Sequence, residues 1–352
     1  MVADSDKIEP VVGMIHSTNL PELFRSFGGA LFVTTYQANR ILLCTASKQE
    51  KISILMRTLP KPMGLALRQK RMAICCKNQI WFFSPVFGLG DIEGSGINHE
   101  FTFAPRSCHV TGDVAAHQAE FVGDDFYFVN TRFSCVCAVR EDASFTPIWK
   151  PHFVSGIAPE DRCHLNGFCF EDSHLRYATA LGESDEPEGW RDQKASGGVL
   201  IDVKAREVLA RGLSMPHSPK LHNGKLYCLE SGRGRLVSID RVSGEVQEVA
   251  RFPGFLRGLD FVDRFAFVGL CKLRGEKMFR GLPIEELHDQ LKCAVFVVDL
   301  QTGQTVAFME FTKGVEELFD VGFYQGAISP HMVGFEGELI DEVMSLPQEI
   351  NA

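Results

Sequence analysis

Short apolar runs separated by turn residues dominate the chain. They are rich in β-branched or aromatic side chains and end at Gly, Asn, Asp or Ser, as in 30–35, 41–45, 126–130, 265–270 and 294–299. Such runs predict β-strands. Helical spacing is scarce, and the best predicted helix is 283–292, where Pro283 begins the segment and Lys292 ends it. Shorter helices are expected at 21–27 and 338–346. The pattern therefore predicts an all-β protein.

A strand–turn–strand unit recurs along the chain. It is marked by two apolar residues five positions apart on either side of a turn, in the pairs Leu67/Met72, Phe121/Phe126, Phe170/Leu175 and Leu221/Leu226. Successive pairs are 54, 49 and 51 residues apart, and Phe261/Phe265 follows after 40 with a shorter turn. This period predicts a single six-bladed β-propeller. A pair of β-sandwiches is the main alternative, but it does not predict such even spacing.

The repeat also predicts how the chain is organised. We expect a lead-in at 1–29, a propeller over 30–340 and a tail at 341–352. Strands near 30–47 should complete the blade that begins near residue 320, because this closes the ring and removes its edges. Two insertions interrupt the repeat: a polar rim loop at 183–196, with Trp190 expected to be exposed, and the helix at 283–292.

Composition and charge narrow the range of partners. The net charge of −9 argues against nucleic acid as the main partner, because phosphate binding needs a basic face. The 11 cysteines lie mostly in apolar runs, which is typical of buried free thiols. We find no signal-peptide pattern and no apolar stretch near the ~20 residues that span a bilayer. A cytoplasmic protein without a membrane partner is therefore expected.

Polar residues recur at one position of the repeat. Four residues before each first apolar anchor stand Met63, His117, Asn166, His217 and Arg257. In a propeller this position begins the strand that lines the central channel. His109 and His164 lie just upstream of two of these positions, each directly after a cysteine.

The histidines predict a metal centre on the propeller axis. Neutral imidazole is the commonest metal ligand, so we expect His109, His117, His164 and His217 to hold or surround a divalent ion. A histidine-rich set favours Fe(II) over Zn or Cu. Asp113, Glu120 and Asp161 are candidates to fix an imidazole tautomer.

Two other interpretations of these residues stay open. The histidines could simply satisfy buried backbone groups. Alternatively, a metal-free site could clamp an anionic ligand, with His117 or His217 as general base; its basic residues would be Arg106, Arg162, Arg257 and Lys220. Cys108 and Cys163 are expected to pack inside their blades, because adjacent strand residues point to opposite faces.

Several motifs carry a resemblance to a known family. Cys-His-Val-Thr-Gly-Asp at 108–113, Asp-Arg-Cys-His-Leu-Asn-Gly at 161–167 and Leu-Ser-Met-Pro-His-Ser-Pro at 213–219 resemble a bacterial family of conserved hypothetical proteins. The resemblance spans about 30–330 and implies one intact domain, with no established activity. The last motif is also similar in style to gluconolactonase and strictosidine-synthase-like propellers, which implies an axial metal ion. Of their usual ligands, Asn166 matches, whereas His117 and His217 do not.

The sequence thus favours a metal-dependent enzyme acting on a small molecule or a peptide side chain. Iron as the metal would imply an oxidoreductase of the oxygenase type. Zinc would imply a hydrolase that uses an activated water. Asn166, Arg257 and Asp113 are the residues expected to act on the substrate. The alternatives are a non-enzymatic interaction module and a metal-free binder of an anionic small molecule.

Overall fold

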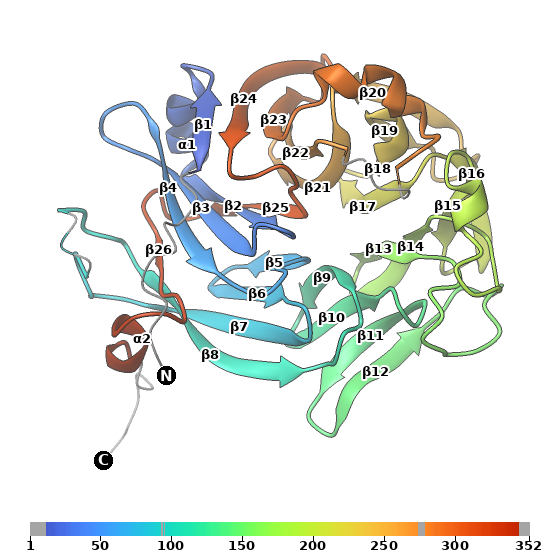
Figure 1. Ribbon diagram of the computed structural model, residues 1–352, viewed down its shortest axis with the longest axis horizontal. Coiled ribbons are helices and arrows are strands. Elements are labelled where there is room, and N and C mark those ends of the chain that lie inside the picture. The colour runs from blue at the N-terminus through green and yellow to red at the C-terminus, as the bar shows by residue number, and fades with distance from the viewer. Residues whose placement is uncertain (1–11, 93, 95, 274–278, 345–352) are drawn as a thin grey trace, which may run out of the picture.

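The computed structural model describes residues 12–92, 94, 96–273 and 279–344. Within these residues, six sheets surround a common axis, as Figure 1 shows. Neighbouring strands within a sheet are antiparallel, apart from β26, which joins its sheet in parallel. The predicted six-bladed β-propeller is therefore confirmed. No helix in the described ranges has the length and apolar character needed to cross a membrane.

We number the blades by chain order of their inner strands. Blade 1 holds β5 (Leu65–Arg68), β6 (Arg71–Cys75), β7 (Gln79–Val86), β8 (Thr102–Val110) and β26 (His331–Met332). Blade 2 holds β9 (Ala116–Val122), β10 (Asp125–Asn130), β11 (Cys135–Arg140) and β12 (Ala143–Trp149). Blade 3 holds β13 (Leu165–Glu171), β14 (His174–Ala180), β15 (Gly198–Asp202) and β16 (Glu207–Leu213).

The other half of the ring follows the same plan. Blade 4 holds β17 (Pro216–His222), β18 (Lys225–Glu230), β19 (Arg235–Ile239) and β20 (Val246–Arg251). Blade 5 holds β21 (Phe255–Val262), β22 (Phe265–Cys271), β23 (Ala294–Asp299), β24 (Gln304–Lys313) and β1 (Gly13–His16). Blade 6 holds β25 (Asp320–Gln325), β2 (Gly29–Thr35), β3 (Arg40–Ala46) and β4 (Ile52–Thr58). Two α-helices are described, α1 (Leu20–Phe27) and α2 (Leu339–Glu342), with 3₁₀ turns η1 (Arg191–Gln193), η2 (Ser231–Arg233) and η3 (Pro283–Gln290).

The apolar pairs that mark the repeat are cross-strand neighbours. The anchors of blades 1 to 4 face each other directly across the first hairpin of each blade. In blade 5 the prediction was wrong by one residue, because Phe261 pairs with Ala266 rather than with Phe265. The hairpin therefore keeps the same spacing in all five blades.

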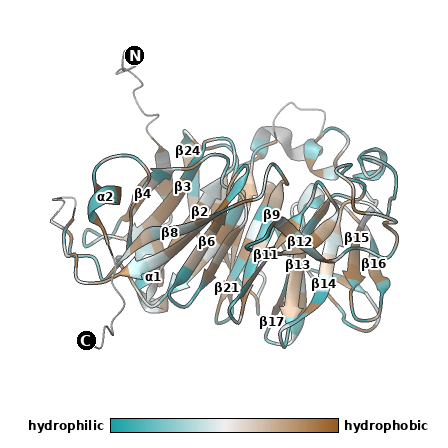
Figure 2. Ribbon diagram, turned by 90° about the horizontal axis from the view of Figure 1, so that it is seen from below, coloured by the Kyte–Doolittle hydropathy of each residue, from teal (hydrophilic) through white to brown (hydrophobic). Residues whose placement is uncertain are grey.

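A late strand and three early strands of the chain close the ring in blade 6. The inner strand β25 pairs along its whole length with β2, from Thr34 opposite Asp320 to Gly29 opposite Gln325. This confirms that strands near 30–47 complete the blade begun near residue 320. Apolar side chains fill the space between neighbouring blades, and Figure 2 shows hydrophobic colour along the strands and hydrophilic colour at many loops. Ordered residues before position 30 also pack on the ring, because β1 extends blade 5 and α1 covers the seam between blades 5 and 6.

Two local predictions were wrong. The segment 283–292 forms the 3₁₀ turn η3 instead of an α-helix. Trp190 in the rim insertion is buried, at 1% exposure, rather than exposed. Its ring packs on His164 and its Nε1–H donates to Asp161, so the indole gains both apolar cover and a hydrogen-bond partner. Trp190 is therefore not exposed on the rim loop for contact with a partner.

Replacing Phe24 with alanine should loosen the seam that closes the ring. Phe24 in α1 is fully buried and contacts Phe323 of β25 and Phe267 of β22. Removing a ring of this size from a packed core costs about 3–5 kcal/mol of unfolding free energy. Urea unfolding should show this loss for Phe24→Ala and almost none for Glu22→Ala on the exposed side of the same helix. Equal stability of the two variants would contradict the packing described.

Candidate functional site

Four of the five predicted axial residues meet on the propeller axis. His117, Asn166, His217 and Arg257 border one narrow space of about 10 Å³, where the inner strands of blades 2 to 5 begin. We call this space the waist of the channel, and it lies between two larger cavities. An upper chamber of about 270 Å³ shares His117 and Arg257 with it, and a lower chamber of about 480 Å³ shares Gln118 and Asp320 with it. The repeat alignment therefore located the centre of the channel.

The backbone turns sharply just before the axial position. The residue two places upstream has a positive φ in four blades: Lys61 (46°), Ala115 (51°), His164 (48°) and Met215 (48°). Such a conformation is unfavourable for most residues with a side chain and persists only where the surrounding structure fixes it. In blades 2 and 4 this turn directs a carbonyl oxygen at the axial histidine.

His117 and His217 are held in the same way in two different blades. The Nδ1–H of His117 donates to the carbonyl of Ala115 at 2.8 Å and lies 2.8 Å from the Thr131 hydroxyl. The Nδ1–H of His217 donates to the carbonyl of Met215 at 2.9 Å, with the Ser231 hydroxyl also at 2.9 Å. A carbonyl can only accept, so both neutral rings carry their proton on Nδ1 and present a lone pair at Nε2.

A third imidazole is fixed by a carboxylate. Both oxygens of Asp161 accept from Nδ1–H of His164, at 2.9 and 3.1 Å. One of these oxygens also accepts from Trp190 of the rim insertion at 3.2 Å. The rings of His164 and His117 meet edge-on, 5.0 Å apart. Asp161 thus fixes the tautomer of His164, which had been predicted as one of its roles.

Arg257 supplies the positive charge at this point of the channel. The residue is 7% exposed, and its Nε–H has no hydrogen-bond partner in the described residues. Its nearest carboxylate oxygen, on Glu317, is 3.8 Å from a terminal nitrogen. The guanidinium lies over the ring of Phe319, 4.7 Å from its centre. A buried guanidinium with an unused N–H is ready to bind an oxyanion.

Burial and this charge keep the two axial histidines neutral. Desolvation lowers the pKa of His117 well below 6.5, and the charges of His164 and Arg257 lower it further. Desolvation also lowers the pKa of His217 well below 6.5, and the charge of Arg257 lowers it further. Neutral rings with Nδ1–H leave Nε2 as a hydrogen-bond acceptor, and for His217 this atom is buried without a partner among the described residues.

The walls of the upper chamber combine aromatic and charged residues around this polar base. Its aromatic lining residues are Tyr36, Phe255, Phe279 and Phe319. The chain segment between β14 and β15 adds Arg191 to the lining, and the segment between β22 and β23 adds Lys272 and Phe279. The basic residues Arg191, Arg257 and Lys272 outnumber the two carboxylates in the lining, Asp161 and Glu317, which favours an anionic occupant.

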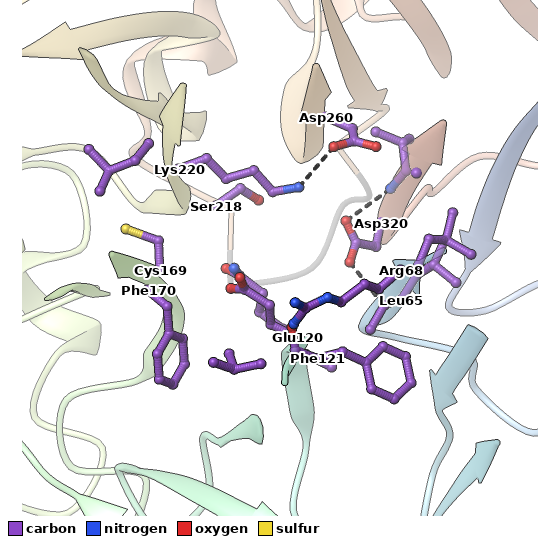
Figure 3. Close-up of a pocket in the computed structure, with 18 of the residues that line it drawn as sticks. Leu65, Arg68, Glu120, Phe121, Cys169, Phe170, Ser218, Lys220, Asp260 and Asp320 are labelled. Atoms are coloured by element: carbon purple, nitrogen blue, oxygen red, sulfur yellow. Dashed lines mark hydrogen bonds and ion pairs between the residues drawn. The ribbon is translucent and has the colours of Figure 1, made fainter. Parts of the chain in front are cut away.

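The lower chamber is lined by charged residues from all parts of the ring. Figure 3 shows Arg68, Lys220, Asp260 and Asp320 around the open space, with Glu120 beside them. Lys220 pairs with Asp260 at 3.2 Å. Burial raises the pKa of Glu120 to about 7 and that of Asp320 to about 7, while Lys220 acts to lower both.

The remaining predicted site residues lie elsewhere or are already engaged. His109 is on β8, the fourth strand from the axis, where its Nε2 lies 3.0 Å from the carbonyl of Ser144. Asp113 is exposed and lines none of the three axial cavities. Asn166 lies on the axis, but its amide donates to Pro216 and accepts from Thr179.

Two predictions about neighbouring residues have opposite outcomes. Cys108 is exposed rather than packed, because this end of β8 is a sheet edge, whereas Cys163 is buried as expected. Arg106 is exposed, and Arg162 is bound to Glu160 and Asp185. Of the predicted basic clamp, Arg257 and Lys220 face the channel.

The described residues do not form a set of ligands for the predicted metal centre. Among the described residues, no group of three or more His, Cys, Asp or Glu side chains is arranged to hold a metal ion. Sequence reasoning also missed the aromatic residues of the upper chamber and, in the lower chamber, Arg68, Asp260 and Asp320, whereas Glu120 and Lys220 had been named for other roles. Glu120, Lys220 and Asp260 each lie one residue before the first apolar anchor of their inner strand, where alternation could have indicated an inward-facing position.

The neutral histidines predict a specific pH dependence. Unfolded His117 takes up a proton below about pH 6.5, whereas the folded ring stays neutral, so the folded state loses stability as the pH falls through this value. The stability difference between wild type and His117→Gln should therefore shrink from pH 8 to pH 5 in urea unfolding. Glu120→Gln serves as a control with the opposite pH dependence. Its stability relative to wild type should increase as the pH rises from 4.5 to about 7. Parallel pH profiles for all three proteins would contradict these environments.

Three solved structures are similar to this chain at low sequence identity. A chain of the nidogen/laminin complex is 9% identical, with a TM-score of 0.48 over 84% of this chain and 97% of that chain. A Bacteroides caccae protein of unknown function is 10% identical, with a TM-score of 0.49 and coverages of 85% and 100%. The Pan2 WD40 domain of Neurospora crassa is 15% identical, with a TM-score of 0.40 and coverages of 70% and 64%.

Comparison with protein families gives a more definite result. None of the curated proteins compared with the chain matches it. Residues 18–333, by contrast, match the family described as a domain of unknown function, DUF4915. Since the match covers most of the sequence, this chain belongs to the DUF4915 family.

Proposed function

We propose that the upper chamber binds a small organic acid without a metal ion. The observation that carries this proposal is the buried guanidinium of Arg257, whose Nε–H lacks a partner in the described residues. A carboxylate or similar oxyanion would accept from this group in the forked geometry that guanidinium favours. Binding would also neutralise a charge that the 3.8 Å contact with Glu317 compensates weakly.

The histidines complement the rest of such a ligand. The Nε2 atom of His117 would accept a hydrogen bond from a hydroxyl group near the acid, while His217 borders the adjoining waist. The aromatic walls would hold an apolar or planar body, since Phe255, Phe279 and Phe319 line the same chamber. These features favour a hydroxy acid with an apolar body over inorganic phosphate.

Acid–base chemistry on the bound acid follows from the Asp161–His164 pair. Asp161 orients the imidazole and would stabilise its protonated form, as an orienting carboxylate does beside a general base. His164 lines the upper chamber together with Arg257. In this proposal, His164 takes a proton at Nε2 from a ligand group while Arg257 holds the acid. The protein would then be an enzyme of proton transfer rather than a passive binder.

A metal-dependent enzyme remains a second candidate because of one observation. His117, His164 and His217 all donate Nδ1–H to an oxygen and leave Nε2 free, as metal-binding imidazoles do. A divalent ion, Fe(II) in preference to Zn or Cu, would supply oxygenase or hydrolase chemistry on a small-molecule or peptide substrate. The Arg257 cation beside these rings disfavours a second cation there, so we place this candidate after the organic acid.

Arg257→Gln should weaken binding of organic acids. The substitution keeps a polar side chain but removes the charged guanidinium that holds the acid. We expect aromatic and aliphatic hydroxy acids, screened by thermal shift and measured by calorimetry, to bind wild type and to lose at least about tenfold in affinity in the variant. Arg264→Gln is the matched control, because Arg264 follows the same strand at its far end and is half exposed. Unchanged affinity in Arg257→Gln would contradict the proposal.

Metal analysis separates the two candidates in the same preparations. The protein should be purified without a histidine tag, with and without anaerobic handling. The organic-acid site predicts far less than one equivalent of iron, zinc or copper, together with acid binding that survives a chelator. About one equivalent of metal, lost in a His117→Gln and His217→Gln double variant, would favour the metal-dependent enzyme instead.

A further inference from the structure

The lower chamber is a separate cavity with its own charged groups. It has a volume of about 480 Å³ and opens on the opposite side of the waist from the organic-acid chamber. The waist holds only about 10 Å³ of free space, roughly one water molecule, so a ligand in one chamber does not reach into the other. This cavity can therefore have its own ligand.

Two of its carboxylates are engaged by the fold. Asp320 accepts the backbone N–H of Leu65 and of Val321 at 2.9 Å, one on each oxygen. Asp260 accepts the backbone N–H of Phe323 at 2.8 Å on one oxygen and Lys220 at 3.2 Å on the other. These aspartates connect neighbouring blades, so their carboxylates are used mainly for structure.

Three other charged side chains keep binding capacity toward the cavity. Glu120 on β9 receives no hydrogen bond from any described residue. Lys220 on β17 donates to Asp260 and has two further N–H groups. Arg68 on β5 donates to the carbonyl of Phe121 at 2.8 Å and keeps its other donors. Figure 3 shows the charged ends of Lys220 and Arg68 reaching the same open space from different blades.

We propose that the lower chamber is a binding site for a zwitterion of the free amino-acid class. The ammonium group of the ligand contacts Glu120, and its carboxylate lies between Lys220 and Arg68. A ligand with one charge only leaves one side of this arrangement unmatched. The volume accommodates an amino acid with a side chain, and the nearby Phe121 and Phe170 offer apolar contact for it.

The electrostatics of the chamber agree with this assignment. Burial raises the pKa of Glu120 to about 7, which marks a carboxylate that lacks a strong partner in the empty cavity. An ammonium group beside Glu120 favours the ionised carboxylate. Amino-acid binding therefore releases protons near neutral pH, and calorimetry in buffers of different ionisation enthalpy detects this release.

The test starts with ligands rather than variants. Each proteinogenic L-amino acid is screened against the full chain by thermal shift, and binding is measured by calorimetry. For any amino acid that binds, the N-acetyl derivative lacks the ammonium charge and the methyl ester lacks the carboxylate. We expect each derivative to bind at least about tenfold more weakly than the free amino acid. No binding of any amino acid at millimolar concentration, or equal affinity of either derivative, overturns the proposal.

Variants then locate the ligand. Glu120→Gln, which is nearly isosteric, should weaken amino-acid binding at least about tenfold, whereas Asp172→Asn at the exposed rim of the same cavity should leave it unchanged. Arg257→Gln should also leave it unchanged, which separates this site from the organic-acid site. Loss of amino-acid binding in Arg257→Gln places the ligand in the upper chamber and overturns the proposal. If Glu120→Gln does not fold, the derivative series on wild-type protein still decides.

Discussion

A ring of polar contacts between neighbouring inner strands holds the channel together. The amide of Gln118 donates to Phe168 in the next blade, and that of Asn166 donates to Pro216 in the blade after it. Lys220 then contacts Asp260, which accepts from Phe323, and Asp320 accepts from Leu65. The Gly64 N–H donates to Ala116 and completes the circuit. Glycine at 167 and 258 permits this close approach, since a Cβ there would meet the next inner strand at 2.4–2.5 Å. Every blade is thereby fixed relative to the axis.

This rigidity explains why unusual groups persist at the waist. A buried arginine with an unused N–H and a buried imidazole with a free lone pair are both unfavourable unless the structure around them is fixed. The positive-φ turns at Ala115 and Met215 belong to the same arrangement, because they place the carbonyls that fix His117 and His217. The fold therefore stabilises a polar centre in which the Nε–H of Arg257 and the Nε2 of His217 lack partners among the described residues, which is the property expected of a ligand site.

The sequence predicted the frame of this centre but not its surroundings. The apolar pairs five residues apart identified the first hairpins, because cross-strand packing in every blade requires them, and counting back from them located His117, His217 and Arg257. His109 was wrongly placed on the axis because it directly follows a cysteine, as His164 does. It lies instead on the outer strand β8. Trp190 was misjudged because its polar neighbours suggested a solvated loop, whereas its contacts with His164 and Asp161 come from a distant part of the chain. Long-range contacts of this kind leave no local pattern in one sequence.

The protonation state of the axial imidazoles tests the account most directly. Long-range ¹H–¹⁵N NMR spectra at pH 7, assigned with single histidine variants, report which ring nitrogen carries the proton. The account predicts that His117 and His217 are neutral with the proton on Nδ1, so that both present an acceptor to the channel. A proton on Nε2, or doubly protonated rings at this pH, would contradict the geometry on which the organic-acid site depends.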